Sequence, residues 1–220
     1  MLLYYITDRS QFSGDEVSRR KKLLEKMAEA AECGVDFIQL REKDLSTHEL
    51  ELLARDAMGV IGDNSPPFGT SGPIATRLLI NSRTDVAIGC GAEGVHLRSD
   101  DVSPGIVRET WRHSLMPGRA SAIVTIACHT VSEVRVAAEK GADFALFGPI
   151  FEKREARSPV PLAGLSLLKD ACQQDISIIA LGGITLENAR TCLGAGATGI
   201  AGIRIFQENK ISQVVRQLKN

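Results

Sequence analysis

The 220-residue sequence predicts an α/β fold of the (βα)8 or TIM-barrel class, in which eight parallel strands close into a barrel. The first observation is a fourfold repeat: a glycine, a small residue, a polar residue and a short apolar run, beginning at Gly34, Gly91, Gly141 and Gly196. The second is the spacing of 57, 50 and 55 residues, because a strand–helix unit takes about 25 to 30 residues and each interval therefore holds two. The third is a helix-like stretch before each copy, which predicts a left-handed glycine at the helix end and a buried strand after it.

The strands are expected where short apolar runs are bounded by turn residues. In chain order they are Leu2–Thr7, Asp36–Arg41, Leu78–Asn81, Gly94–Leu97, Ala122–Ala127, Phe144–Phe147, Ile176–Leu181 and Gly199–Gly202. Four of the eight follow the repeated glycines, and the other four alternate with them. This alternation predicts a barrel in which strand–helix units with the glycine repeat alternate with strand–helix units that lack it.

The helices are expected between the strands, with starts marked by capping residues and by a first-turn proline. In order they cover Asp15–Cys33, a stretch after the N-cap Ser46, Asp85–Cys90, a stretch from Pro104, one from about Val131, one ending near Gln173, Leu186–Ala195 and Ile211–Leu218. One long connection, Gly62–Arg77, contains three prolines. It leads from a helix into a strand, so we expect a surface insertion at the amino end of the barrel, away from the chemistry.

Composition favours a single domain over residues 1–220 with a large core, since 44% of the residues are hydrophobic. The net charge of −1 argues against a nucleic-acid or membrane partner held by bulk charge. The first residues match neither a signal peptide nor a membrane span. The five cysteines are scattered without Cys-x-x-Cys spacing, which predicts reduced thiols and a cytoplasmic protein.

Two cationic side chains follow the second strand, where barrel active sites form. Strand residues alternate in direction, so Gln39, Arg41 and, next in the series, Lys43 are expected on one face. Cations inside the barrel mouth need an anionic partner. A phosphate or diphosphate ligand is one interpretation, and an ion-pair belt with neighbouring carboxylates is the other.

Glycines close the seventh and eighth strands, at Gly182, Gly183 and Gly202, with Ile203 next. The loops after these two strands are a recurrent phosphate site in this fold, because bare backbone amides and a helix N-terminus can approach an oxyanion. Two tight turns without a ligand would give the same sequence.

Titratable residues follow the third, fourth and fifth strands. His129 is expected either to transfer protons or to cap the next helix, and His96 either to reach the pocket or to pack inside. Cys128 is interpreted as a small buried hydrophobe. Asn81, which ends the third strand, is a candidate for binding the substrate or its diphosphate. Asp100 and Asp101 after the fourth strand are candidates for binding Mg²⁺ or for capping a helix.

Five segments resemble the thiamine phosphate synthase and thiazole tautomerase superfamily. They are Tyr5–Arg9, Gln39–Asp44, Gly94–Leu97, Gly148–Phe151 and Gly182–Thr185. The resemblance implies the same barrel fold and a phosphate clamp formed here by Gly182, Gly183, Gly202 and Ile203. In the synthases, residues matching Gln39, Arg41 and Lys43 hold a diphosphate. The synthase joins a hydroxymethylpyrimidine diphosphate to a thiazole phosphate with Mg²⁺, whereas the tautomerase aromatises a thiazole carboxylate phosphate by moving protons, without a metal.

The sequence departs from the synthase pattern at its metal and diphosphate groups. Ser82 stands where synthases carry a metal-binding aspartate, although the second family aspartate matches Asp101. Arg98 and Ser99 replace a Gly-Gln pair. The threonine-rich loop over the pyrophosphate is replaced by residues 152–158, which carry two glutamates. A hydroxyl is a poorer Mg²⁺ ligand than a carboxylate, so these changes favour the tautomerase branch.

Three hypotheses follow from this pattern. The first is a tautomerase-like enzyme acting on a small phosphorylated substrate, with His129 as acid and base and no cofactor. The second is a divergent synthase in which Asp101 and substrate oxygens hold Mg²⁺. The third is a binder of thiamine metabolites without catalysis. Homo-oligomer formation, a lid over residues 152–161 and the roles of Arg98 and Arg204 stay open at this stage.

Overall fold

The computed structural model describes residues 1–64, 75–114, 121–152 and 161–219. Eight parallel strands pair in chain order and β8 pairs with β1, so the sheet closes into the predicted barrel. The strands are β1 (Leu2–Ile6), β2 (Phe37–Leu40), β3 (Arg77–Asn81), β4 (Gly94–Leu97), β5 (Ile123–Cys128), β6 (Phe144–Phe147), β7 (Ser177–Leu181) and β8 (Gly199–Gly202). They lie within about two residues of the predicted bounds.

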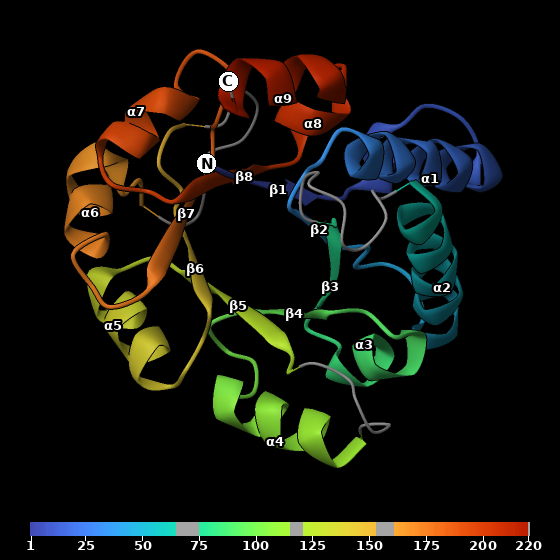
Figure 1. Ribbon diagram of the computed structural model, residues 1–220, viewed down its shortest axis with the longest axis horizontal. Helices are drawn as coiled ribbons and strands as arrows, with labels where there is room; N and C mark the ends of the chain where they lie inside the picture. The colour runs from blue at the N-terminus through green and yellow to red at the C-terminus, as the bar shows by residue number, and fades with distance from the viewer. Residues whose placement is uncertain (65–74, 115–120, 153–160, 220) are drawn as a thin grey trace.

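Helices form an outer ring around the strands (Figure 1). They are α1 (Glu16–Glu32), α2 (Thr47–Asn64), α3 (Thr84–Cys90), α4 (Pro104–Ser114), α5 (Val131–Glu139), α6 (Gly164–Ala171), α7 (Ala189–Gly194), α8 (Arg204–Gln207) and α9 (Ile211–Lys219). The main core lies between the strands and these helices, and a second apolar cluster that includes Tyr4, Phe37 and Leu146 fills the barrel. No helix in the described part of the chain is long and apolar enough to cross a bilayer.

All four repeated glycines are left-handed, as predicted, with φ of 77° at Gly34, 85° at Gly91, 78° at Gly141 and 106° at Gly196. In each copy the glycine N–H donates to the carbonyl three residues back, and the next N–H donates to the carbonyl five residues back. These are the two bonds of a Schellman motif, which satisfies the last free carbonyls of a helix. The repeat therefore ends four helices in the same way.

The polar residue of each copy ties the next strand to its neighbour. Its backbone N–H donates to a carbonyl near the start of the preceding strand in all four copies, at Leu3, Leu78, Val124 and Ile178. In the first three copies a carboxylate oxygen also accepts from the N–H of that same residue, over 2.7 to 2.8 Å. Thr198 occupies this place in the fourth copy.

The helix boundaries differ from the predictions in three places. Helix α2 continues to Asn64, and residues 65–74 of the long connection lie outside the described residues. Helix α7 begins three residues later than predicted, because Thr185 and Asn188 exchange side-chain and backbone hydrogen bonds in a turn. The short helix α8 was not predicted, since four residues are too few to show a helical period.

Candidate functional site

Gln39 lies inside the barrel at the carboxyl end of β2, on the face that the alternation predicted. Its side chain is almost fully buried, and its amide Nε2 donates to Asn81 Oδ1 over 2.8 Å. The amide oxygen Oε1 of Gln39 is enclosed and has no hydrogen-bond partner among the described residues. A buried acceptor left without a donor costs about 1–3 kcal/mol. This orphaned oxygen is therefore suited to accept a hydrogen bond from a ligand.

Arg41 is held at the same mouth by its backbone. Its N–H donates to Thr7 Oγ1 over 2.9 Å, and its half-buried guanidinium forms no ion pair within the described ranges. The alternative of an ion-pair belt around Arg41 therefore finds no partner here. Lys43 lies in the turn beyond β2 with an exposed side chain. The mouth thus carries a cation available to an anionic ligand.

The carboxylates that follow β2, Glu42 and Asp44, pair with another arginine, Arg9, to which the sequence analysis assigned no role. Its guanidinium contacts Glu42 over 3.0 Å and Asp44 over 2.7 Å, and Thr7 Oγ1 donates to Glu42 over 2.6 Å. Burial raises the pKa of Glu42, against the hydrogen bonds from Thr7 and Arg9. The only indication of this cluster in the sequence was that the segments Tyr5–Arg9 and Gln39–Asp44 end two strands predicted to be adjacent.

His129 stands at the end of β5 and is not the cap of α5. Thr130 caps that helix in a capping box with Glu133, so the capping alternative belongs to its neighbour. The Nδ1 atom of His129 lies 2.6 Å from the carbonyl oxygen of Gly148. A carbonyl only accepts, so Nδ1 carries the proton and Nε2 of the neutral ring keeps its lone pair. His129 is therefore held in the tautomer of a general base.

Cys128, next to this histidine, is buried as predicted. Burial is the main cause that raises the pKa of its thiol to about 12, so a nucleophilic thiolate is disfavoured.

Gly182 and Gly183, after β7, are left-handed and stand where only glycine fits, whereas an added Cβ at Gly202, at the end of β8, would meet only a side chain. Gly183 has φ of 64°, and a Cβ there would lie 2.6 Å from the carbonyl oxygen of Phe151. A Cβ on Gly202 would lie 2.8 Å from Ile205. Ile203 is the N-cap of α8, so a helix N-terminus follows β8 directly, whereas α7 begins only at Ala189. The helix that accompanies this pair of loops is thus the unpredicted α8, an arrangement typical of barrel phosphate sites.

Asp101 is engaged by three hydrogen bonds. Ser82 Oγ donates to it over 2.6 Å, and Arg98 donates from its backbone over 2.8 Å and from its guanidinium over 3.3 Å. Partial burial would raise the pKa of Asp101, but these bonds lower it. Asp101 makes no bond that caps α4 among the described residues.

The Mg²⁺ site that the resemblance implies needs two carboxylates at this position. The donor set here is one carboxylate, already bonded to a hydroxyl and to an arginine. No group of three or more His, Cys, Asp or Glu side chains in the described ranges could hold a metal. The residues present do not fit a dedicated Mg²⁺ site.

His96 points into the barrel from β4. Its Nδ1 lies 2.8 Å from Thr125 Oγ1, and the Tyr4 hydroxyl lies 3.1 Å from the same oxygen. Burial is the main cause that lowers the pKa of His96 to about 3, with Arg41 acting in the same direction and Asp101 against it. The imidazole is therefore neutral at physiological pH.

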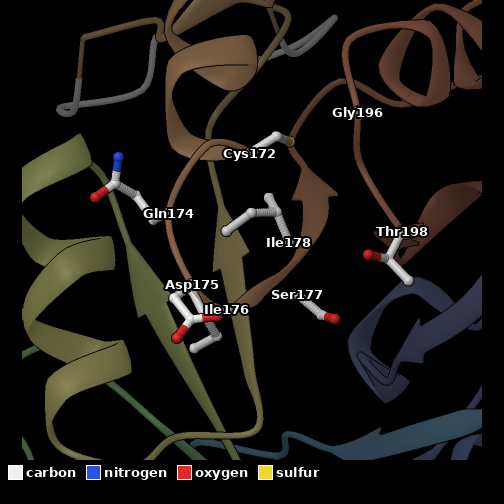
Figure 2. Close-up of a pocket in the computed structure, with 8 residues that line it drawn as sticks. All are labelled: Cys172, Gln174, Asp175, Ile176, Ser177, Ile178, Gly196 and Thr198. Carbon is white, nitrogen blue, oxygen red and sulfur yellow. The ribbon is translucent and has the colours of Figure 1, made fainter.

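A cavity of about 390 Å³ lies at the opposite end of the barrel, near the start of β7 (Figure 2). Its lining includes Cys172, Asp175, Ser177 and Thr198. Barrel chemistry takes place at the carboxyl ends of the strands, and this cavity lies at the amino end. We therefore assign the candidate site to the mouth formed around Arg41, His129 and Gly183.

Comparisons with known proteins identify the family of this chain. Residues 3–206 match the family model described as thiamine monophosphate synthase. A thiamine-phosphate synthase of Clostridium novyi is 31% identical over 210 residues, covering 94% of this chain and 91% of that protein. One of Syntrophomonas wolfei is 32% identical over 202 residues, covering 91% and 86%. The structure of a thiamine phosphate pyrophosphorylase from Pyrococcus furiosus superposes with a TM-score of 0.78 at 24% identity, over 99% of this chain and 93% of that one, which supports the fold.

Proposed function

The chain belongs to the thiamine monophosphate synthase family of thiamine-biosynthesis enzymes, and we propose that it isomerises a thiazole phosphate by proton transfer. The substrate class is a thiazole carboxylate phosphate, as in the tautomerase branch. The single observation that carries this proposal is the 2.6 Å contact between Nδ1 of His129 and the Gly148 carbonyl oxygen, from which we infer that the ring proton is on Nδ1. The Nε2 atom of His129, which keeps a lone pair, is the atom that exchanges protons with the thiazole ring of the substrate.

The step conserves every atom of the substrate. Nε2 of His129 takes a proton from one ring position, and the electron pair released moves into the ring π-system. The imidazolium formed keeps its Nδ1–H bonded to the Gly148 carbonyl, which stabilises the positive charge. Nε2 then returns the proton to a second position, and the aromatic tautomer results.

The phosphate is assigned to the β7 and β8 side of the mouth. Because Gly183 has no side chain, a phosphate can approach its backbone closely. The Gly183 N–H makes no hydrogen bond to the other described residues. The N-terminus of α8, which follows β8 at Ile203, adds partial positive charge on this side of the mouth. This pocket uses backbone dipoles, so a doubly charged phosphate is bound without a buried cation.

A second candidate is a divergent thiamine-phosphate synthase, which transfers a pyrimidine group with release of pyrophosphate. Two observations favour it: the guanidinium of Arg41 lies unpaired at the mouth within the described ranges, and both curated relatives above are named thiamine-phosphate synthase. The donor set at Asp101 counts against its Mg²⁺-dependent form.

One assay with two channels tests both candidates. The purified chain is incubated with the non-aromatic thiazole carboxylate phosphate, and in parallel with the two synthase substrates, each with and without Mg²⁺. We expect aromatisation that is independent of Mg²⁺. His129→Asn keeps a donor for the Gly148 carbonyl but loses Nε2, so turnover is expected to fall by about 10²- to 10⁴-fold.

The matched control is His113→Asn. His113 also places Nδ1 against a backbone carbonyl, that of Glu109 over 2.8 Å, but it is exposed on α4. This variant should turn over like the original chain. Product formed only from the two synthase substrates would replace the first proposal by the second. No product in either reaction would favour a protein that binds thiamine metabolites without catalysis.

A further inference from the structure

We propose that His96 is a second binding residue of this site, a neutral imidazole whose Nε2–H donates to an anionic oxygen of the substrate. The proposal rests on the proposed function only in assuming that a small anionic substrate occupies the mouth. It adds a residue whose role the sequence left open between pocket and packing. The geometry that supports it is a hydrogen-bond relay of three side chains inside the barrel.

The relay fixes which nitrogen of His96 carries the proton. Tyr4, Thr125 and His96 are linked through Thr125 Oγ1, at 3.1 Å and 2.8 Å. The Tyr4 hydroxyl is fully buried and makes no other hydrogen bond to the described residues, so its hydrogen has an acceptor only if it donates to Thr125. The Thr125 hydrogen then has an acceptor only at Nδ1 of His96. When the Tyr4 and Thr125 hydroxyl hydrogens both have acceptors, Nδ1 of His96 accepts a hydrogen bond, and the proton of the neutral His96 ring is therefore on Nε2.

His96 lies one residue before the carboxyl end of β4, so it stands near the mouth of the barrel. Its Nε2 atom makes no hydrogen bond to the described residues, and it is not among their fully enclosed polar atoms. The residue as a whole keeps 6% of its surface exposed. A donor hydrogen in this place has no partner until a ligand supplies one.

Charges around Nε2 indicate the chemistry of that ligand. The Arg41 cation is close enough to oppose a second positive charge on His96, and it is unpaired among the described residues, whereas Asp101 is engaged by Ser82 and Arg98. An anionic oxygen can therefore take its charge balance from Arg41 and a directional bond from His96. The oxygen belongs either to the thiazole carboxylate or to a diphosphate, since both present the same acceptor.

The two histidines of the site then have complementary roles. His129 has its proton on Nδ1 and a free lone pair on Nε2, whereas His96 has the reverse arrangement. A neutral histidine donor does not compete for the proton that the base must move. His96 is thus suited to hold and orient the substrate while His129 exchanges the proton.

The first test reads the tautomer in the unmodified protein. Long-range ¹H–¹⁵N spectra of the [¹⁵N]histidine-labelled chain at neutral pH report which nitrogen of each of the four histidines is protonated. A spectrum of His96→Gln assigns the signal. We expect a protonated Nε2 on His96 and a protonated Nδ1 on His129. Tyr4→Phe frees Thr125 to accept, so the Nδ1–H form of His96 should gain population. A protonated Nδ1 on His96 in the unmodified chain would overturn the proposal.

The second test measures binding, without turnover, of three probes: the thiazole carboxylate phosphate, the thiazole phosphate that lacks the carboxylate, and inorganic pyrophosphate. His96→Met removes the donor at similar size, whereas His96→Gln keeps an N–H near the Nε2 position. We expect His96→Met to weaken one anionic probe by roughly tenfold to a hundredfold, and His96→Gln by less than about threefold.

The affected probe identifies the acceptor oxygen. Loss confined to the carboxylated thiazole assigns it to the carboxylate, and loss confined to pyrophosphate assigns it to a diphosphate. Binding of all three probes at unchanged affinity by His96→Met would overturn the proposal. A chain inactive in the turnover assay would still give either binding result, so failure of the proposed function is distinguishable.

Discussion

The two ends of the barrel are constructed differently. At the amino end the same device occurs four times: a left-handed glycine, a Schellman pair and a polar residue bonded to the preceding strand. At the carboxyl end the strands finish in different groups, among them Arg41, His129, the Gly182–Gly183 pair and Gly202. Ending a helix and starting the next strand has the same geometric requirement in each unit, so the same motif can repeat. The proposed binding and proton transfer need unlike groups, which would account for the different residues at the other end.

The ion-pair cluster of Arg9 with Glu42 and Asp44 lies at the carboxyl end but has a structural role. Its loss should have the largest effect on the free energy of unfolding. Arg9→Met would leave Glu42, whose side chain is only 2% exposed, without its cation. We expect a loss of about 3–5 kcal/mol in the free energy of unfolding. Urea denaturation measures it.

Arg20→Met is the matched control, because Arg20 pairs with Glu16 and Glu49, which are both about half exposed. Its loss should stay within about 1 kcal/mol. Equal losses in the two variants would mean that the Arg9 cluster carries no special structural role.

A glycine-to-alanine pair compares the two ends directly. Gly183 and Gly91 are both left-handed, but a Cβ on Gly183 would press on backbone carbonyls, whereas a Cβ on Gly91 meets nothing within 4 Å. Gly183→Ala should cost about 2–5 kcal/mol from strain and overpacking together, and should weaken phosphate binding. Gly91→Ala should cost about 1–2 kcal/mol and leave binding unchanged. Thermal unfolding and calorimetry with the thiazole phosphate separate these outcomes.

Exchanging the polar residues of the first and fourth copies tests whether the repeated device stabilises the fold. Asp36→Thr removes the acceptor for the buried Leu3 N–H, at 2.8 Å, and the ion pair with Lys219. A loss of about 1–3 kcal/mol is expected. Thr198→Asp adds the carboxylate that the fourth copy lacks and should gain about 1 kcal/mol. Unchanged stability in both would contradict a structural role for this position.

The smallest expected effect is a pH dependence at the mouth. The pKa of His96 is lowered to about 3 by burial, so the unfolded chain binds this proton at a higher pH than the folded chain. The free energy of unfolding should therefore fall by about 1 kcal/mol as pH decreases from about 6.5 to 5.5. His96→Gln should flatten this slope by the same amount, and an identical slope in both proteins would contradict the low pKa. The raised pKa of Glu42 acts in the opposite direction at lower pH, so the comparison stays above pH 5.5.

The sequence predicted the fold well because the repeated device is local. Each left-handed glycine lies within a few residues of the helix it ends and the strand it starts, so spacing alone gave eight strands. The alternation along β2 likewise predicted Gln39 on the inner face, where its side chain is buried against Asn81.

The contacts of the site were less predictable, because they join residues far apart in the chain. Arg9 meets Glu42 and Asp44 across 33 and 35 positions, and Tyr4 reaches Thr125 across 121. No periodicity reports such pairs. The roles of Ser82 toward Asp101 and of Gly148 toward His129 also depend on neighbouring strands, so they emerged only from the folded chain.

The packing of β6 against β7 has a consequence for how this enzyme could change. Gly148, whose carbonyl orients His129, lies so close to β7 that a Cβ would fall 1.9 Å from the Leu181 oxygen, and a Cβ on Gly182 would fall 2.6 Å from Pro149. The proposed base and the glycines of the proposed phosphate site thus lie along one tightly packed seam. Widening that proposed phosphate site for a different substrate would also move the carbonyl that orients His129.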